Sequence, residues 1–574
     1  MTKQYNTESL DEGKKRFTSS TFRIIPLGGQ EEVGRNMTVF EYENDIVIVD
    51  MGIQFPEEDM PGIDYIIPNI NYLKDKLKKI KAVVFTHGHL DHIGAAPILL
   101  EKLGYPLVIS REFTIALIKR KMEEYKKGSA SRLKTIQIKP NLKEKISLGQ
   151  LKLDFFDVEH STIDSVGIII SSPVATAIHM GDWTLGMDSS GRKLSYNFLS
   201  KLNKPTILMI ESLGAVNRQP LVTEKDMWKN IKTIIDEAPG RIIIATFSTQ
   251  VKRIREILNY AQEIGKKVAI DGYSMRMILE IAKKLGYIRV GKETLIDIRK
   301  IDDYPPNKIV IICTGTQGEP KAVLSRIVAD NHNYVKLRKT DTILFSSSII
   351  PGNERTIQSL KDGLYRKCDN VIHNEIMNIH VSGHTNVEGI QEVTRQIKPT
   401  YVLPVYANHY FLKEAKKIIK EIGFPENNIF VLDNGQIINF NKTNTPIIEK
   451  EKADTNYIFI DGLRIGDVGE IVLRDRQMLA KDGMFVIVVV VDKQTGKVKG
   501  SPDIISRGFV YLRESKELLK DTRKRVVEIV HRATDSGGAV NWSYIKDEIR
   551  NKIGQFFYIR TQRRPMILPV VIEV

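Results

Sequence analysis

The stretch Thr86-His87-Gly88-His89-Leu90-Asp91-His92 places four potential metal ligands within six residues, directly after the apolar run 82–85. Neutral imidazole and carboxylate groups suit zinc or manganese. A loop at the end of a strand can turn alternate side chains towards two neighbouring ions, so that the first two ligands face one ion and the last two face the other. The alternative is a surface loop rich in histidine, which is disfavoured because the chain has only 11 His and three lie here.

Two further ligand candidates follow predicted strands. His160 comes after the run 151–158, and Asp182 comes after 177–181, where Gly181 is consistent with a close backbone approach. Taken singly, each is equally well explained as a capping or hydrogen-bonding residue. As members of one set with the histidine-rich loop, they indicate a metal centre.

The sequence around this loop predicts layered α/β structure. Short β-rich runs occur at 22–29, 45–50 and 82–86, and several end in polar residues. Helical periodicity follows at 98–103 and 113–125, which argues against an all-β barrel.

The pattern changes downstream. From 207 to about 362, apolar strands alternate with amphipathic helices, as expected of parallel βαβ units. Polar-tipped strands return at 378–440, and 441–454 has linker composition. The last α+β segment, 458–574, contains a buried strand, a helix around 516–532 and a terminal apolar strand.

Composition sets broad limits on function. The 574 residues are 42% apolar and 27% charged, which is typical of a globular protein with several domains. The net charge of +15 favours anionic partners such as nucleic acid or an acidic membrane surface, although a solvated basic surface explains it equally well.

The apolar segments and the cysteines indicate a cytoplasmic protein without a membrane anchor. The longest apolar run, 484–491, is shorter than the roughly 20 residues of a membrane span, and the first 17 residues contain no signal-peptide core. Only Cys313 and Cys368 occur, which gives no disulfide framework and no Cys-x-x-Cys motif. Any metal must therefore be held by His and carboxylates.

These motifs resemble a known family. The His-x-His-x-Asp-His run, Asp50, His160 and the Gly181-Asp182 pair resemble the metallo-β-lactamase motifs. The stretches at 314–320, 346–354 and 380–384 resemble the β-CASP nucleases, specifically ribonuclease J, as does the stretch 502–510. The resemblance implies an α/β fold: a metallo-β-lactamase αββα sandwich with an inserted β-CASP α/β domain and a C-terminal α+β domain. The expected segments are an extension (1–20), the sandwich (21–207 and 363–440), the insert (208–362), a linker (441–457) and the C-terminal domain (458–574).

The resemblance also implies the roles of the site residues. One ion is expected on His87, His89 and His160, and a second on Asp91 and His92, with Asp182 bridging them. Zinc is expected, with manganese or magnesium as alternatives. Asp91 and Asp182 are expected to be catalytic together with His384, an acid held by Glu211 where the family usually has Asp. The expected substrate-binding residues are Phe247, Ser248, His380, Ser382, Gly383 and His384.

One position departs from the family pattern. Tyr406 stands in Pro-Val-Tyr-Ala-Asn, where the family has a His that completes the second metal site. A phenol ligates only as phenolate, and its unperturbed pKa is about 10, so weaker occupancy of the second site is expected. His409 replaces the missing ligand only if the loop is rearranged, and a surface or packing role is preferred for it.

By resemblance, the chain is expected to cut single-stranded RNA from the 5′ end and internally, in RNA maturation and decay. A homodimer, a homotetramer or a hetero-oligomer with a paralogous ribonuclease J is expected. Two alternatives stay open: a weakly active or non-catalytic RNA-binding subunit, and a metallo-hydrolase of a small substrate.

Overall fold

A computed structural model describes residues 20–57, 59–139, 145–186, 194–220, 222–350, 352–442, 445–462, 464–466, 470–510, 515–534 and 541–574. Residues 1–19 of the predicted N-terminal extension 1–20 lie outside these ranges. The chain forms two compact units. The first unit takes in the residues up to Gln54 and Ile67–Tyr457, and the second takes in Phe55–Ile66 and Ile458–Val574.

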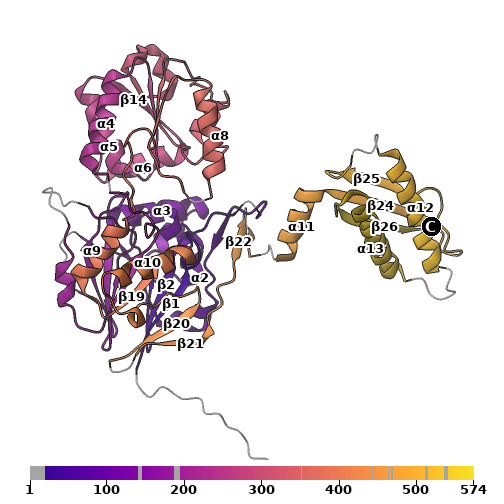
Figure 1. Cartoon of the computed structure of the whole chain (residues 1–574), viewed down its shortest axis with the longest axis horizontal. Coiled ribbons are helices and arrows are strands. Elements are labelled where there is room, and N and C mark those ends of the chain that lie inside the picture. Colours follow the sequence, from indigo (N-terminus) through magenta and orange to yellow (C-terminus); the bar gives the residue numbers. More distant parts are fainter. Residues whose placement is uncertain are drawn as a thin grey trace, which may run out of the picture. The chain divides into compact units, whose positions relative to one another are not determined.

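Two mixed sheets form the base of the first unit (Figure 1). Runs of β-branched residues such as Ile46-Val47-Ile48-Val49 are buried throughout, as expected of strands covered on both faces. The eight-stranded sheet has the order β21 (Ile447–Lys452), β20 (Gln436–Phe440), β1 (Phe22–Gly28), β2 (Met37–Tyr42), β3 (Asp45–Val49), β5 (Ile80–Val84), β6 (Leu107–Ser110), β7 (Thr135–Gln137). The six-stranded sheet has the order β19 (Tyr401–Val405), β12 (Thr206–Glu211), β11 (Thr176–His179), β10 (Val166–Ser171), β9 (Leu151–Asp157), β8 (Ile146–Leu148).

The two sheets pack face to face, with helices outside them. Phe40 and Val47 of the first sheet share one core cluster with Leu153 and Ile168 of the second. The outer helices are α1 (Leu90–Ile93), α2 (Ala96–Lys102), α3 (Glu112–Tyr125), α9 (Val387–Ile397) and α10 (His409–Glu421). Short 3-10 helices lie at η1 (Asn71–Lys79), η2 (Ser129–Arg132), η3 (Asn197–Lys201), η4 (Ile298–Asp303), η5 (Pro306–Lys308) and η6 (Glu426–Asn428). The predicted αββα sandwich is confirmed.

The insert is a parallel sheet between helices, as predicted. Figure 1 shows α8 on one side of this sheet and α4 and α5 on the other. The strand order is β15 (Leu295–Ile296), β14 (Lys267–Asp271), β16 (Ile309–Cys313), β13 (Ile242–Ala245), β17 (Thr342–Phe345), β18 (Asn370–His373), and all neighbouring strands are parallel. The helices are α4 (Glu224–Glu237), α5 (Val251–Glu263), α6 (Tyr273–Lys284), α7 (Val323–Val328) and α8 (Glu354–Tyr365).

Several predicted boundaries need correction. β12 lies between β11 and β19 in the sandwich and β18 belongs to the insert, so the insert's elements run from Glu224 to His373 rather than from 208 to 362. Part of the predicted linker 441–457 forms β21, an exposed edge strand. Its charged residues resemble linker composition because edge strands also carry exposed charges. The sheet to which a strand belongs depends on its pairing partners, which local composition does not reveal.

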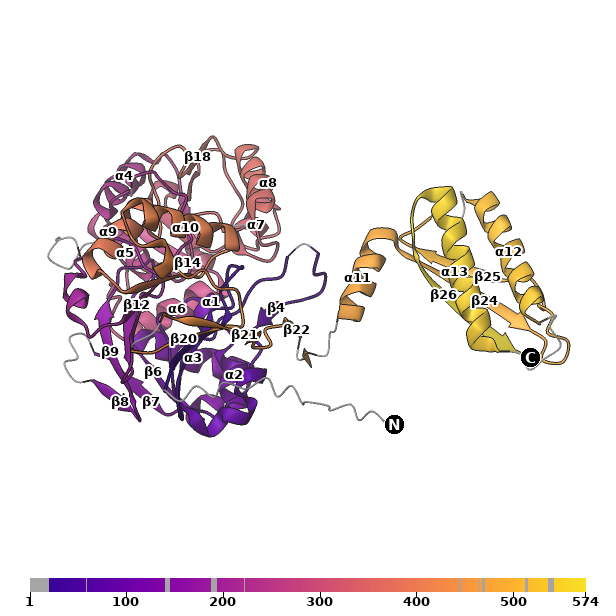
Figure 2. The ribbon, with the colours of Figure 1, turned by 60° about the horizontal axis from the view of Figure 1, so that its bottom comes forward.

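The second unit contains the predicted C-terminal α+β structure. β24 (Met484–Val491) pairs with β25 (Asp503–Arg507) and with β26 (Met566–Glu573). One face of this sheet packs against α12 (Lys516–Thr534) and α13 (Trp542–Thr561), which lie side by side (Figure 2). The remaining elements are β4 (Tyr65–Ile67), β22 (Ile458–Asp461), β23 (Arg464–Ile465) and α11 (Glu470–Asp482).

Residues 55–66, predicted as part of the sandwich, join this second unit instead. Ile63 and Ile66 pack against Phe459, which supplies the apolar partner that holds the segment there. Within the parts of the chain that the structure describes, no helix is long and apolar enough to cross a membrane.

Candidate metal centre and active site

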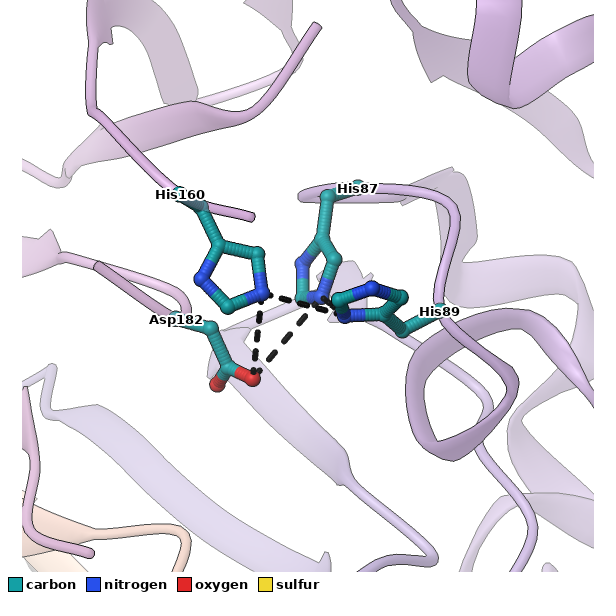
Figure 3. A group of neighbouring side chains, drawn as sticks. All are labelled: His87, His89, His160 and Asp182. Carbon is teal, nitrogen blue, oxygen red and sulfur yellow. Dashed lines mark hydrogen bonds and ion pairs between the residues drawn. The ribbon is translucent and has the colours of Figure 1, made fainter. Parts of the chain in front are cut away.

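Loops after three strands of the first unit bring the predicted ligands together (Figure 3). The histidine-rich loop follows β5 and runs into α1, while His160 follows β9 and Asp182 follows β11. Gly181 has a φ of +63°, and a Cβ there would lie 3.1 Å from the Thr86 side chain. A tight turn at Gly181 therefore brings Asp182 against the loop.

Three imidazoles and a carboxylate form the first cluster. His89 Nδ1 lies 3.0 Å from both His87 Nε2 and His160 Nε2. Asp182 Oδ2 is 3.8 Å from His87 Nε2 and 3.9 Å from His160 Nε2. The four ligand atoms lie within 4.8 Å of one another, which matches the donor set and the spacing of a tetrahedral zinc site.

The second cluster shares Asp182 with the first. His92 Nε2 is 3.3 Å from Asp182 Oδ2 and 3.4 Å from Asp91 Oδ2. The Nδ2 of buried Asn36 also lies here, 3.0 Å from His92 Nε2. Among the residues described, only two carboxylates and one imidazole form this group.

Buried partners orient three of these imidazoles. His92 Nδ1 donates to Asp50 Oδ2 at 2.8 Å, and His87 Nδ1 lies 3.0 Å from the Thr86 hydroxyl, which itself donates to Asp50. His160 Nδ1 donates to the Gly383 carbonyl at 2.7 Å. These bonds leave the Nε2 atoms facing the cluster, the orientation that a metal ligand requires.

The electrostatic environment also fits a cation. Burial lowers the pKa of His87 and His160 well below the ordinary value, and neighbouring histidines lower it further, so both imidazoles are neutral. Burial opposes a charge on His92, but the carboxylates of Asp182, Asp91 and Asp50 outweigh it and raise the pKa of His92 well above its ordinary value. The same carboxylates would attract a divalent ion.

The predicted acid and its partner lie beside the first cluster. The ring of His384 is 5.4 Å from that of His160, centroid to centroid, and His384 Nδ1 is 3.6 Å from Glu211 Oε2. Glu211 is fully buried at the end of β12. Burial opposes protonation of His384, but Glu211, Asp182 and Asp91 outweigh it and raise its pKa to about 9. A protonated imidazole therefore faces the cluster at neutral pH.

The predicted substrate-binding residues lie on two loops. Ser382 Oγ accepts from the His384 N–H at 3.1 Å, and Gly383 approaches so closely that a Cβ there would be 2.8 Å from His160 Cε1. Phe247 and Ser248 are half-buried on the loop between β13 and α5. Arg253, in the first turn of α5, joins the loops by donating to His380 Nδ1 at 2.8 Å.

Tyr406 is buried beside the second cluster, but its hydroxyl contacts other groups. It lies 2.9 Å from His179 Nε2 and 3.5 Å from Asp50 Oδ2. Burial and the nearby carboxylates raise the pKa of Tyr406 well above its ordinary value, so no phenolate forms. His409 is half-exposed and faces Asp433, at 3.7 Å, rather than this cluster.

Sequence reasoning missed several residues that contact the site. Asn36, Arg253, Thr249 and His179 carry no local signal, because ordinary polar residues occupy loops and helix starts throughout the chain. Asp50 was noted as part of the motif, but only the fold shows that it holds His92.

A two-sheet sandwich with outer helices, a parallel α/β insert and a buried His/Asp cluster at the strand ends define a metallo-β-lactamase-fold hydrolase of the β-CASP type. Residues 31–192 match the model of the metallo-β-lactamase superfamily. Residues 239–364 match the ribonuclease J β-CASP domain, and 471–574 match the ribonuclease J C-terminal domain.

Full-length relatives agree with these matches. The chain is 34% identical to ribonuclease J2 of Bacillus subtilis (strain 168), over 98% of this chain and 100% of the relative. It is also 34% identical to ribonuclease J 1 of Streptococcus pyogenes serotype M3, over 96% and 97%. A crystal structure of a protein of unknown function from Enterococcus faecalis V583 shares the fold, with a TM-score of 0.51, 14% identity and coverage of 73% of this chain and 100% of that one. The chain belongs to the ribonuclease J family, and it is a metal-dependent hydrolase that acts on RNA.

Proposed function

We propose that this ribonuclease hydrolyses single-stranded RNA by a two-metal mechanism, both from the 5′ end and internally, in RNA maturation and decay. The observation that carries the proposal is the pair of clusters that share Asp182. His87, His89, His160 and Asp182 would hold one ion, preferably zinc, with manganese or magnesium as alternatives. Asp91, His92 and Asp182 would hold the second.

The residues around the clusters have separate roles in this proposal. Divalent ions, when bound, lower the pKa of water and neutralise charge on the attacked phosphate. His384 donates a proton to the leaving oxygen, and Glu211 keeps its imidazole charged. Asp50 orients His92, and the carbonyl of Gly383 orients His160.

We propose that the 5′-phosphate of the RNA is held by the loops that carry Phe247, Ser248, His380, Ser382 and Gly383. His380 supports this role. Burial and the charge of Arg253 lower the pKa of His380 well below its ordinary value, so the imidazole is neutral. Its Nδ1 accepts from Arg253, so its Nε2 carries a proton, and Nε2 is buried without a partner among the described residues. This N–H is available for a phosphate oxygen.

The setting we propose is the cytoplasm, within a homo-oligomer. Cys313 and Cys368 are buried and unpaired, which fits a reducing compartment. A hetero-oligomer with a paralogous ribonuclease J is the alternative assembly.

A weakly active subunit is the second candidate function, and Tyr406 favours it. Its hydroxyl is engaged by His179, so the second cluster lacks the ligand that the family's His supplies. In that case the chain would bind RNA, and a more active partner would cut it.

Cleavage of a labelled, 5′-monophosphorylated single-stranded RNA tests the proposal. Wild type, Asp91→Ala and the surface control Asp547→Ala are compared in zinc, manganese and magnesium. We expect wild type and the control to release nucleotides and internal fragments, and Asp91→Ala to release neither. RNA binding without cleavage by wild type would favour the second candidate, and cleavage by Asp91→Ala would refute the assignment of the site.

A further inference from the structure

The loop between β13 and α5 reaches the first metal cluster through Thr249. The Thr249 hydroxyl lies 3.0 Å from His89 Nε2. Local hydrogen bonds hold the loop in place: Thr246 N donates to the Cys313 carbonyl at 3.1 Å, and Gln250 N donates to the Phe247 carbonyl at 3.1 Å. Thr249 is therefore held on a short turn between a buried strand and a helix of the insert.

The direction of this hydrogen bond follows from the geometry of His89. Its Nδ1 faces His87 and His160 at 3.0 Å, so Nδ1 is the atom that would bind a metal and must keep its lone pair free. The proton of the neutral imidazole then lies on Nε2, which donates to the Thr249 oxygen. By accepting this bond, the Thr249 oxygen stabilises the tautomer that metal binding requires.

The hydrogen-bond partner of His89 belongs to the insert, whereas the partners of the other histidines of the centre do not. His87, His92 and His160 are held by Thr86, Asp50 and the Gly383 carbonyl, all outside the insert. These three side chains are almost completely buried, whereas His89 is partly exposed. Packing therefore restrains His89 less, and its orientation depends more on the one bond from the insert.

A second contact joins the start of α5 to the sandwich. Lys252, three residues beyond Thr249, forms an ion pair with Glu159, which directly precedes His160. Thr249 and Lys252 thus connect the insert to two loops of the sandwich that carry residues of the metal cluster.

We propose that Thr249 is a positioning residue, which holds His89 in its metal-binding tautomer and orientation, so that metal affinity depends on the β-CASP insert. This inference rests on the proposed metal centre. Residues that orient a metal-bound histidine typically contribute about 10- to 100-fold to metal affinity.

Zinc affinity of the full-length chain, measured by competition with a chromophoric chelator, tests the inference. Thr249→Val removes the hydroxyl and keeps the shape, while Thr249→Ser keeps the hydroxyl. Thr114→Val is the matched control, because the Thr114 hydroxyl is buried near Gly88 and has no partner in the described part of the chain. We expect zinc affinity about 10- to 100-fold lower in Thr249→Val, and wild-type affinity in Thr249→Ser and Thr114→Val.

The outcomes separate the two proposals. Wild type that binds no zinc would refute the metal centre itself. Tight zinc binding by both wild type and Thr249→Val would overturn the role of Thr249 and leave the centre intact. An equal loss in the serine variant or in the control would also overturn it. Thermal unfolding of the metal-free proteins, expected to be the same for all variants, shows that a lower affinity does not reflect a misfolded chain.

Discussion

At the scale of single residues, Tyr406 stands where the resemblance to the family predicts a metal-binding histidine. Its hydroxyl lies 2.9 Å from His179 Nε2, and its pKa is raised well above the ordinary value of a phenol. Replacing Tyr406 by His should supply an imidazole lone pair to the second cluster. We expect Tyr406→His to retain more zinc per chain after dialysis and to cleave RNA faster than wild type. Tyr406→Phe is the control, which loses the hydroxyl and gains no ligand. Equal zinc content in Tyr406→His and wild type would contradict the prediction.

Glu211 controls the charge of the proposed acid. Its buried carboxylate raises the pKa of His384, whereas a neutral amide of the same shape would not. We expect Glu211→Gln to lower the cleavage rate by about 100-fold or more, the usual contribution of general acid catalysis, with unchanged zinc content. Rate assays and metal analysis check this, with the exposed Glu388→Gln as control. A wild-type rate in Glu211→Gln would rule out the assigned role.

At the scale of secondary-structure elements, one buried ion pair joins two strands of the insert. Arg241, just before β13, donates to Asp341, just before β17, at 3.0 and 2.7 Å, and both side chains are almost fully buried. Removing one partner leaves a buried charge uncompensated, at a cost of about 3 to 5 kcal/mol. We expect Asp341→Ala to lower the free energy of unfolding by this amount in denaturant titrations.

The exposed pair of Arg338 with Asp302 provides the comparison for this prediction. Exposed pairs contribute up to about 1 kcal/mol, so Asp302→Ala should change stability little. If the two variants proved equally stable, the Arg241–Asp341 pair would not hold the strands together.

One apolar face of the sheet of the second unit is exposed among the described residues. Leu568, Val570 and Ile572 of β26 are each at least 40% exposed, on the side away from α12 and α13. A contiguous exposed apolar face commonly marks an interface, and a second copy of the chain offers a self-complementary one.

For the whole molecule, we therefore predict an oligomer in light scattering that dissociates in the variant Val570→Glu with Ile572→Glu. The control Ile559→Glu changes an exposed residue of α13 and should leave the assembly intact. A monomeric wild type at micromolar concentration would contradict the prediction.

The local pattern of the chain was sufficient to predict the histidine-rich loop that forms the cluster and the layers of the fold. Residues 87–92 contain four potential metal ligands directly after a predicted strand. The alternation of strands and helices in the insert follows from local hydrophobic periodicity. One of the amphipathic helices predicted between 207 and about 362 is α5, Val251–Glu263, because its apolar spacing and length specify such a helix without reference to the rest of the chain.

Only the tertiary structure decided which strands belong together and what surrounds each ligand. β12 belongs to the sandwich because it pairs with β11 and β19, and β18 belongs to the insert because it pairs with β17. Residues 55–66 belong to the second unit, where Ile63 and Ile66 pack against Phe459, far along the chain. Asp50, Thr249 and Gly383 likewise meet three different histidines. A single polar residue has many available partners in an unfolded chain, and only the packing of sheets and loops selects one.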